Sequence, residues 1–315
     1  MSAVGDIVHM YREMRRIRAF EDRLMDLKAG GEVPGSMHLT NGQEAIAVGV
    51  ASILRPDDYV TATYRGHGWA ISRGSDLTGL FAEVMARSGG VNGGRAGSPY
   101  FSDASINFLG ENSIVGAGVP IAAGAALSAQ RHGQGQVSVV AIGDGATNQG
   151  AVHEALNLAA ALTLPMVLVV ENNIYSEMVR IKDMTKIDQL AIRAEGYGIP
   201  GVTIDGNDPD VVAAAAAEAV ERARRGEGPT LIEAMTQRLV GHHSGDAQHY
   251  RPRGEVAEAA LDEPLQRIRD AADAALLSEL DAVDAEVAAE IERAVDAARA
   301  TELPDPNTAK DHVYA

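Results

Sequence analysis

The chain has 315 residues, of which 46% are hydrophobic and 33 are glycines, so it can bury a sizeable core as one large domain or two small ones. Its formal net charge of −17 argues against nucleic acid and anionic membranes as partners, because both repel an acidic protein. Cysteine is absent, which excludes disulfides, thiol catalysis and zinc–thiolate sites.

The N-terminal part of the chain predicts two helices and a strand. We expect a helix at residues 8–28, which ends at Ala29-Gly30-Gly31, and a second helix of small residues from Gly42 to about Leu54. The first helix is amphipathic and rich in arginine, unlike a signal peptide, and no stretch is apolar enough to cross a bilayer. We therefore expect a cytoplasmic enzyme. A strand at residues 59–63 follows.

The remaining elements alternate between strands and helices. We expect strands at residues 136–143, 165–170, 202–205 and 230–236, and helices at residues 77–86, 116–132, 151–164, 209–225 and 255–300. Residues 88–113 form a long glycine-rich loop, which in a compact domain is usually functional. This alternation predicts an α/β fold with a mostly parallel sheet flanked by helices. Without a repeat or linker, residues 1–315 form a single domain, with residues 255–315 as its helical C-terminal extension.

Two polar motifs follow neighbouring strands. Gly143-Asp144-Gly145 ends one strand, and after 26 intervening residues Asn172-Asn173 ends the next. A right-handed crossover makes these strands parallel and brings both motifs to the same edge of the sheet. A carboxylate, an amide oxygen and a backbone carbonyl near Tyr175 suit Mg²⁺, and the glycines let a diphosphate approach the backbone. The alternative is an ordinary turn, in which Asp144 only caps the next helix.

Further motifs lie along nearly the whole chain, and together they give it a family resemblance. The chain resembles the α subunit of the heteromeric, thiamine diphosphate-dependent 2-oxo acid dehydrogenases. The matching segments follow the family's order: Met37-His38-Leu39, Gly42-Gln43-Glu44-Ala45, residues 64–68, residues 112–120, residues 143–150, Glu171-Asn172-Asn173, residues 205–208 and Gly241-His242-His243. The resemblance implies the thiamine diphosphate-binding fold, in its diphosphate-binding form.

The resemblance also assigns cofactor-binding roles to individual residues. It makes Asp144, Asn173 and the carbonyl of Tyr175 the Mg²⁺ ligands. It predicts that the backbone at Gly143, Gly145 and Ala146 contacts the diphosphate. It also predicts that the side chains of Tyr64 and Arg65 contact the diphosphate. Arginine suits this task because its planar guanidinium pairs with phosphate oxygens and stays charged; the alternative for Arg65 is a solvated surface residue. Ser113 and Val115 match the segment that holds the aminopyrimidine ring.

Three histidines are candidate catalytic residues. The resemblance places His242 near the diphosphate and the reacting carbon, where it would also contact the cofactor. It places His38 and His67 at the entrance and floor of the active site. Each of these histidines could instead be structural, as lone histidines often are, and for His243 the two interpretations are balanced. We expect all three candidates to lie on loops that follow strands.

The resemblance implies partners as well. In this family, the glutamate that activates the pyrimidine lies on a separate β subunit, and no second module is recognisable in this chain. We therefore expect an α₂β₂ heterotetramer, with a homodimer as the alternative. The implied reaction decarboxylates a small 2-oxo acid, or cleaves acetoin, and passes the acyl group to a lipoyl group on an acyltransferase. His242 would stabilise or protonate oxygens during this transfer.

Two segments depart from the family pattern. Gly97-Ser98-Pro99-Tyr100 replaces Gly-Ser-Met-His, and Ser176-Glu177-Met178 lies where a small, hydroxyl-bearing loop is common. Either departure can alter the substrate pocket or the acyl acceptor, so the substrate stays open between pyruvate, branched-chain 2-oxo acids and acetoin. A transketolase-like or carboligating enzyme subunit is the alternative function, and a non-catalytic regulatory subunit is a further one.

Overall fold

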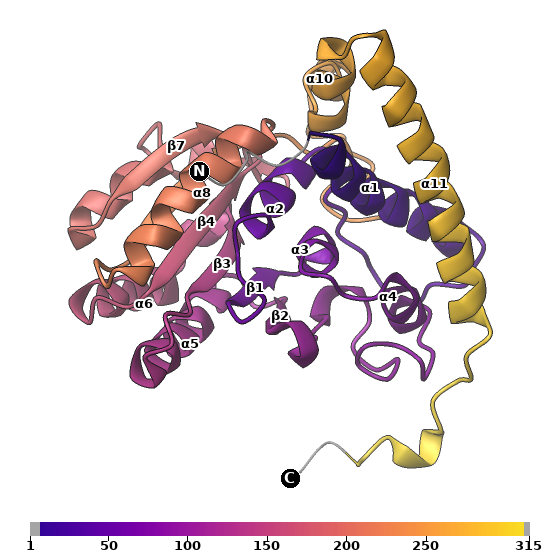
Figure 1. The fold of residues 1–315 in the computed structure, drawn as a ribbon, viewed down its shortest axis with the longest axis horizontal. Helices are drawn as coiled ribbons and strands as arrows, with labels where there is room; N and C mark the ends of the chain where they lie inside the picture. The colour runs from indigo at the N-terminus through magenta and orange to yellow at the C-terminus, as the bar shows by residue number, and fades with distance from the viewer. Residues whose placement is uncertain (1–6, 312–315) are drawn as a thin grey trace.

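The computed structural model describes residues 7–311 and has a six-stranded parallel sheet at its centre (Figure 1). The strand order is β2-β1-β3-β4-β8-β7. The strands are β1 (Tyr59–Thr63), β2 (Phe108–Asn112), β3 (Ser138–Gly143), β4 (Met166–Asn172), β7 (Gly201–Asp205) and β8 (Thr230–Met235). The central strands β3 and β4 are buried along almost their whole length, as expected for a parallel sheet that helices cover on both sides.

Two apolar clusters lie on opposite faces of the sheet. On one face, α2 (Glu44–Ala51), α3 (His67–Ser72) and α8 (Pro209–Arg224) pack on the strands, with α4 (Leu77–Val84) outside them. On the other face lie α5 (Gly118–His132), α6 (Gly150–Ala161) and the 3₁₀ segment η4 (Leu190–Tyr197). Side chains alternate between these faces along β3, where Val139 belongs to the first cluster and Val140 to the second.

The first and last long helices lie side by side at the periphery of the molecule (Figure 1). Helix α1 (Ile7–Ala29) buries an apolar stripe at helical spacing that includes Met10, Met14 and Ile17. Its exposed side carries arginines that pair with acidic residues of α11 (Ala274–Arg299). These pairs are Arg12–Glu286, Arg15–Asp284, Arg16–Glu290 and Arg23–Glu292, at 2.6 to 3.1 Å. Each exposed pair stabilises little, so the buried stripe dominates.

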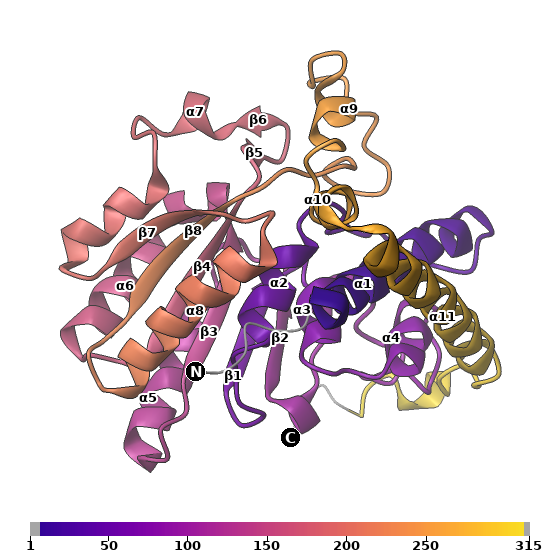
Figure 2. The same ribbon diagram turned by 45° about the horizontal axis from the view of Figure 1, so that its top comes forward.

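A group of short elements lies above the carboxyl ends of the strands (Figure 2). It contains the hairpin of β5 (Tyr175–Ser176) and β6 (Val179–Arg180), and the short helices α7 (Ile181–Met184), α9 (Glu255–Ala259) and α10 (Pro264–Ala271). Glu255 joins the hairpin to α9, because its carboxylate accepts from the Tyr175 hydroxyl at 3.1 Å and pairs with Arg180. The hairpin is therefore fixed in place over this edge.

The structure confirms the α/β fold and corrects several local expectations. Residues 88–113 do not form one loop, because they end in the edge strand β2 and contain two 3₁₀ turns. Helix α3 was not predicted, and it places His67 at a helix start instead of on a loop. The expected helix at residues 255–300 is three separate helices. Within residues 7–311, no helix combines the length and apolarity needed to cross a membrane.

Candidate functional site

A pocket opens at the carboxyl ends of β1, β3 and β4, at the edge where the sequence predicted a site. Most of the predicted cofactor residues line it: Tyr64, Arg65, Val115, Gly143, Asp144, Gly145, Ala146, Asn173, Tyr175 and His242. Other residues that line it are Thr63, Glu171, Ser176, Glu177 and Arg238. Parallel strands place their following loops at one edge, which explains how residues so distant in sequence meet here.

Asp144 presents one unpaired carboxylate oxygen in this pocket. It starts the 3₁₀ segment η3 (Asp144–Asn148) directly after β3, and it is only 2% exposed. Its Oδ1 accepts from the Gly145 N–H at 2.7 Å, whereas the buried Oδ2 has no partner. Burial raises the pKa of Asp144 to about 6, against the opposing effect of this hydrogen bond. A buried, unpaired carboxylate oxygen is costly, and a bound cation would compensate it.

Asn173 and Tyr175 follow β4 beside Asp144. The amide nitrogen of Asn173 donates to Gln43 Oε1 at 3.0 Å, which fixes the amide orientation. Its Oδ1 accepts only a long bond of 3.4 Å from the Tyr175 N–H, so this oxygen remains available as a ligand. No group of three or more His, Cys, Asp or Glu side chains suited to a metal occurs among residues 7–311. A Mg²⁺ site here therefore needs amide and carbonyl oxygens beside the one carboxylate.

The glycines of this loop leave room in the pocket. A Cβ atom at Gly143 would meet open space, whereas one at Gly145 would overlap the side chain of Ser176. The loop thus exposes its backbone at Gly143, whereas at Gly145 the absence of a side chain makes room for Ser176, which packs closely against the loop. This arrangement suits the approach of an anionic group to the backbone N–H groups.

Arg65 and Tyr64 form another wall of the pocket. Arg65 is 5% exposed, and its guanidinium donates to the carbonyl of Leu39 and to that of His242, at 2.9 Å for the second. Such a guanidinium is not a solvated surface group, so the surface interpretation of Arg65 is wrong. The Tyr64 ring packs against His38, with ring centroids 4.4 Å apart.

His242 and His38 are packed together beside this wall, with ring centroids 5.0 Å apart. Burial and the neighbouring Arg65 charge lower the pKa of each histidine to about 3, so both are neutral at pH 7. Arg238 donates to His242 Nδ1 at 3.0 Å, and a guanidinium cannot accept, so the proton of this imidazole is on Nε2. His242 lies seven residues after the end of β8, not at the strand end as expected.

Three predicted residues do not line the pocket. His67 is completely buried, and its ring bonds to Glu21 Oε1 at 3.1 Å and to Ser98 Oγ at 2.7 Å. Ser113 lies partly exposed after β2, in the turn that leads to α5. His38 also lies outside the lining set, although its ring contacts Tyr64 and His242, which line the pocket. The catalytic and cofactor roles of these residues therefore stay predictions.

Sequence reasoning missed Arg238, which is 1% exposed and lies on the pocket wall. Besides His242, its guanidinium donates to the Glu177 carbonyl at 3.0 Å and the Tyr250 hydroxyl at 3.2 Å. Burial lowers the pKa of Arg238 to about 10, so the group stays charged. A single arginine three residues after a strand is not part of any recognisable motif. The only signal in the sequence is that Arg238 lies four residues before His242.

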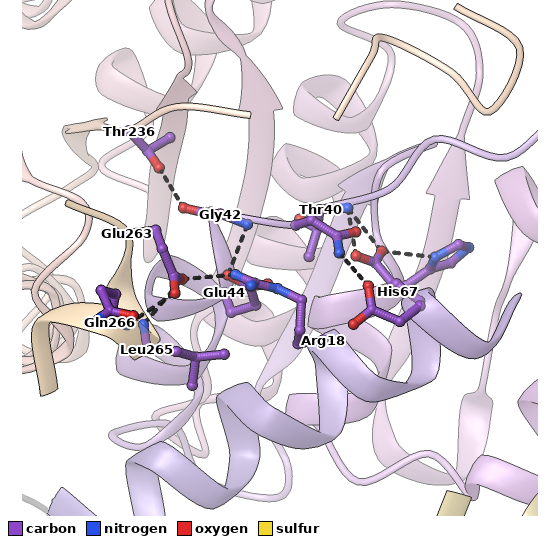
Figure 3. Close-up of polar contacts among 12 residues, drawn as sticks. Arg18, Thr40, Gly42, Glu44, His67, Thr236, Glu263, Leu265 and Gln266 are labelled. Atoms are coloured by element: carbon purple, nitrogen blue, oxygen red, sulfur yellow. Dashed lines mark hydrogen bonds and ion pairs between the residues drawn. The ribbon is translucent and has the colours of Figure 1, made fainter. Parts of the chain in front are cut away.

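A buried ionic network supports the segment that precedes α2. Figure 3 shows Arg18 of α1 between Glu44 and Glu263, and Glu44 accepts from the Gly42 N–H at 3.0 Å. Thr236 donates to the Gly42 carbonyl at 3.1 Å. This network holds the chain that provides Gln43, the partner of the Asn173 amide. The supporting layer therefore reaches from α1 to the proposed metal ligands.

Comparisons with known proteins agree with this geometry. The model of the family described as "Dehydrogenase E1 component" matches residues 12–307. The subunit alpha of acetoin:2,6-dichlorophenolindophenol oxidoreductase from Cupriavidus necator is 42% identical over 98% of this chain and 94% of its own. Its Bacillus subtilis counterpart is 48% identical over 79% and 75%. The pyruvate dehydrogenase E1 component subunit alpha of Porphyra purpurea is 34% identical over 97% and 92%.

Proposed function

The chain belongs to the dehydrogenase E1 component family, as the α subunit of a thiamine diphosphate-dependent 2-oxo acid dehydrogenase, and on this premise we propose how its pocket serves the reaction. The pocket at the ends of β1, β3 and β4 binds the Mg²⁺-diphosphate end of the cofactor. Asp144, Asn173 and the Tyr175 carbonyl are the metal ligands. The buried, unpaired Oδ2 of Asp144 is the observation that supports this proposal most.

The walls of the pocket contribute charge and shape. The backbone is open to the diphosphate at Gly143, Gly145 and Ala146. The wall of the pocket on the side of β1 is formed by Tyr64 and Arg65. Val115 provides an apolar surface for the ring system, with Ser113 beside it. When bound, the cofactor supplies the carbanion chemistry that breaks the bond next to a ketone.

His242 acts on the oxygen atoms of the reacting group. Its neutral imidazole carries the proton on Nε2, because Arg238 occupies Nδ1, and it can therefore donate a hydrogen bond to a developing oxyanion. Arg238 is a positioning residue, since it holds the ring of His242 and also fixes the Glu177 turn. The His38 ring packs edge-to-face against the His242 ring and limits its rotation.

A β subunit completes the active site in this proposal. It supplies the glutamate for the pyrimidine side and forms an α₂β₂ heterotetramer, and a lipoyl-bearing acyltransferase receives the acyl group. Large apolar side chains are exposed around α5 and α6, which supports a protein partner on this side: Ile114, Ile121, Leu158 and Leu162. The cytoplasmic location stays a prediction.

The transketolase-like alternative is not favoured, because the relatives above are named oxidoreductase and dehydrogenase subunits. A non-catalytic role has no support either, since the pocket residues are intact. The substrate class is pyruvate, another small 2-oxo acid, or acetoin.

The test is dye reduction by the co-expressed α and β subunits with Mg²⁺, thiamine diphosphate and each substrate class. We expect reduction that requires cofactor and metal, and that Asp144→Asn abolishes, while calorimetric titration shows loss of cofactor binding in the same variant. Formation of a new carbon–carbon bond without dye reduction would instead establish the carboligase. Full turnover by the α subunit alone would contradict the β-subunit proposal.

A further inference from the structure

The turn between β5 and β6 places an acidic side chain at the rim of the pocket. Ser176 pairs with Val179, so Glu177 and Met178 form a two-residue turn. Glu177 has a φ of 55°, in the left-handed region that glycine and asparagine adopt more easily. A glutamate at this position is strained, and backbone strain at a pocket rim often accompanies function.

Both sides of this turn are fixed to the walls of the pocket. Arg238 donates to the Glu177 carbonyl at 3.0 Å, and the Ser176 side chain packs against Gly145. On β6, Arg180 pairs with Glu255. The turn is therefore part of the pocket wall and not a free surface loop, so its side chains keep a defined position relative to the bound cofactor.

The carboxylate of Glu177 is exposed and unpaired. No hydrogen bond or ion pair to it occurs within residues 7–311, although Arg180 and Arg238 belong to the same part of the fold. Glu177 lines the pocket, and its carboxylate adds to burial in raising the pKa of the Tyr64 phenol, whereas the charges of Arg65 and Arg238 lower it. A substrate in this pocket is therefore close to the negative charge of Glu177 as well as to the two arginines.

The cationic groups of the pocket are already engaged. Of the residues that line it, only Arg65 and Arg238 are cations, and both donate to protein atoms. His38 and His242 are neutral at pH 7, so they offer no positive charge. Both guanidinium groups keep their charge, but their terminal N–H groups donate to neutral protein acceptors and are not free to form a hydrogen-bonded pair with the carboxylate of a 2-oxo acid. The hydroxyl of a neutral hydroxyketone, in contrast, can donate to Glu177.

We propose that Glu177 is a specificity-determining residue, whose carboxylate selects neutral α-hydroxyketones such as acetoin over anionic 2-oxo acids. This inference rests on the proposed function and narrows its substrate class. Repulsion of the substrate carboxylate raises the transition-state energy for 2-oxo acids alone, because a neutral substrate experiences no charge–charge term.

The test compares kcat/KM for acetoin and pyruvate in the α–β assembly with Mg²⁺ and thiamine diphosphate. Glu177→Gln removes the charge at nearly constant shape, and we expect the acetoin-to-pyruvate ratio to fall about tenfold, mainly through faster pyruvate turnover. Glu177→Asp keeps the charge and should retain most of the preference. Glu195→Gln, on an exposed carboxylate of η4 away from the pocket, is the matched control and should leave the ratio unchanged.

Two further readouts separate charge from structure. The preference of the wild-type protein should weaken as salt increases, while that of Glu177→Gln should not, since only a charge interaction is screened. Glu177→Gly should unfold at a higher temperature, because glycine relieves the left-handed strain, and should lose the preference. An unchanged ratio in Glu177→Gln, or a wild-type preference for pyruvate, would overturn the inference; absence of cofactor-dependent turnover with every substrate would instead overturn the proposed function.

Discussion

Glu111 is a buried carboxyl group without a partner, and we predict that its replacement by leucine stabilises the protein. It lies on the edge strand β2 against Gly66, is 7% exposed, and neither of its oxygens has a hydrogen bond. Its register partner on β1 is Ala62, a core residue, and its side chain lies against Gly66 at the start of α3. An unsatisfied buried polar group costs about 1–3 kcal/mol, and Glu111→Leu should recover about this free energy of unfolding.

The raised pKa of Glu111 determines how its effect on stability changes with pH. Burial raises the pKa of Glu111 well above its usual range, and the nearby N–H groups of Phe101 and Gly66 offset only part of the effect. The folded protein therefore binds this proton more tightly than the unfolded chain. The contribution of Glu111 to the stability of the folded protein is least unfavourable below the ordinary glutamate pKa. As the pH rises from there toward the pKa of Glu111 in the folded protein, this contribution becomes more unfavourable by up to about 1.4 kcal/mol per pH unit.

Urea unfolding of the α–β assembly at fixed concentration, at pH 5 and pH 8, measures both effects. The stability gain of Glu111→Leu over wild type should be larger at pH 8 than at pH 5. Glu111→Gln removes the same titration but keeps an unpaired polar group, so it should remove the pH dependence with a smaller gain. A destabilising Glu111→Leu, or a gain that is equal at both pH values, would refute the reasoning and indicate a partner for this carboxylate.

Three further predictions concern the pocket and the sheet. Asp144→Ala should weaken Mg²⁺-dependent cofactor binding at least about 100-fold while circular dichroism stays unchanged, because it removes the carboxylate ligand; calorimetric titration measures this. Gly145→Ala should also weaken cofactor binding through overlap with Ser176, and the double variant with Ser176→Gly should restore it; failure of the rescue would show that the overlap is not the cause. Asp58→Ala should lower the free energy of unfolding in urea by about 3 kcal/mol, because this buried carboxylate pairs with Arg224 and accepts from the backbone at the start of β3. A loss below about 1 kcal/mol would mean that the pair is effectively solvated.

The sequence was most predictive where each motif directly followed a strand. Asp144 and Asn173 each follow a β-branched run, and the rule that parallel strands end at one edge was sufficient to place them together. Gly143 and Gly145 were predicted for the same reason. The positions of these residues depend on local sequence and one topological rule, and neither needs knowledge of distant contacts.

Arg238 and β2 could not be predicted in this way. The edge strand β2 is short, and its pairing with β1 shifts register at Leu109 and Gly110. Its side chains therefore show no regular alternation of apolar and polar residues that would predict a strand. Arg238 points into the pocket because distant partners bind it, namely the Glu177 turn and Tyr250. His67 shows a different limit, since it follows a strand as its candidate role required, yet its buried ring bonds to Glu21 and Ser98 instead of lining the pocket, which the sequence did not indicate.

The pairing of α1 with α11 has a consequence for how the chain is made. The ribosome completes α1 at Ala29 but begins α11 only at Ala274, so at roughly 5–20 residues per second the first helix waits about 12–50 s for its neighbour. During this time Arg12, Arg15, Arg16 and Arg23 lack their acidic partners on α11, and part of the apolar stripe of α1 is open to water or to a chaperone. A helix that is synthesised late therefore encloses one that is synthesised early.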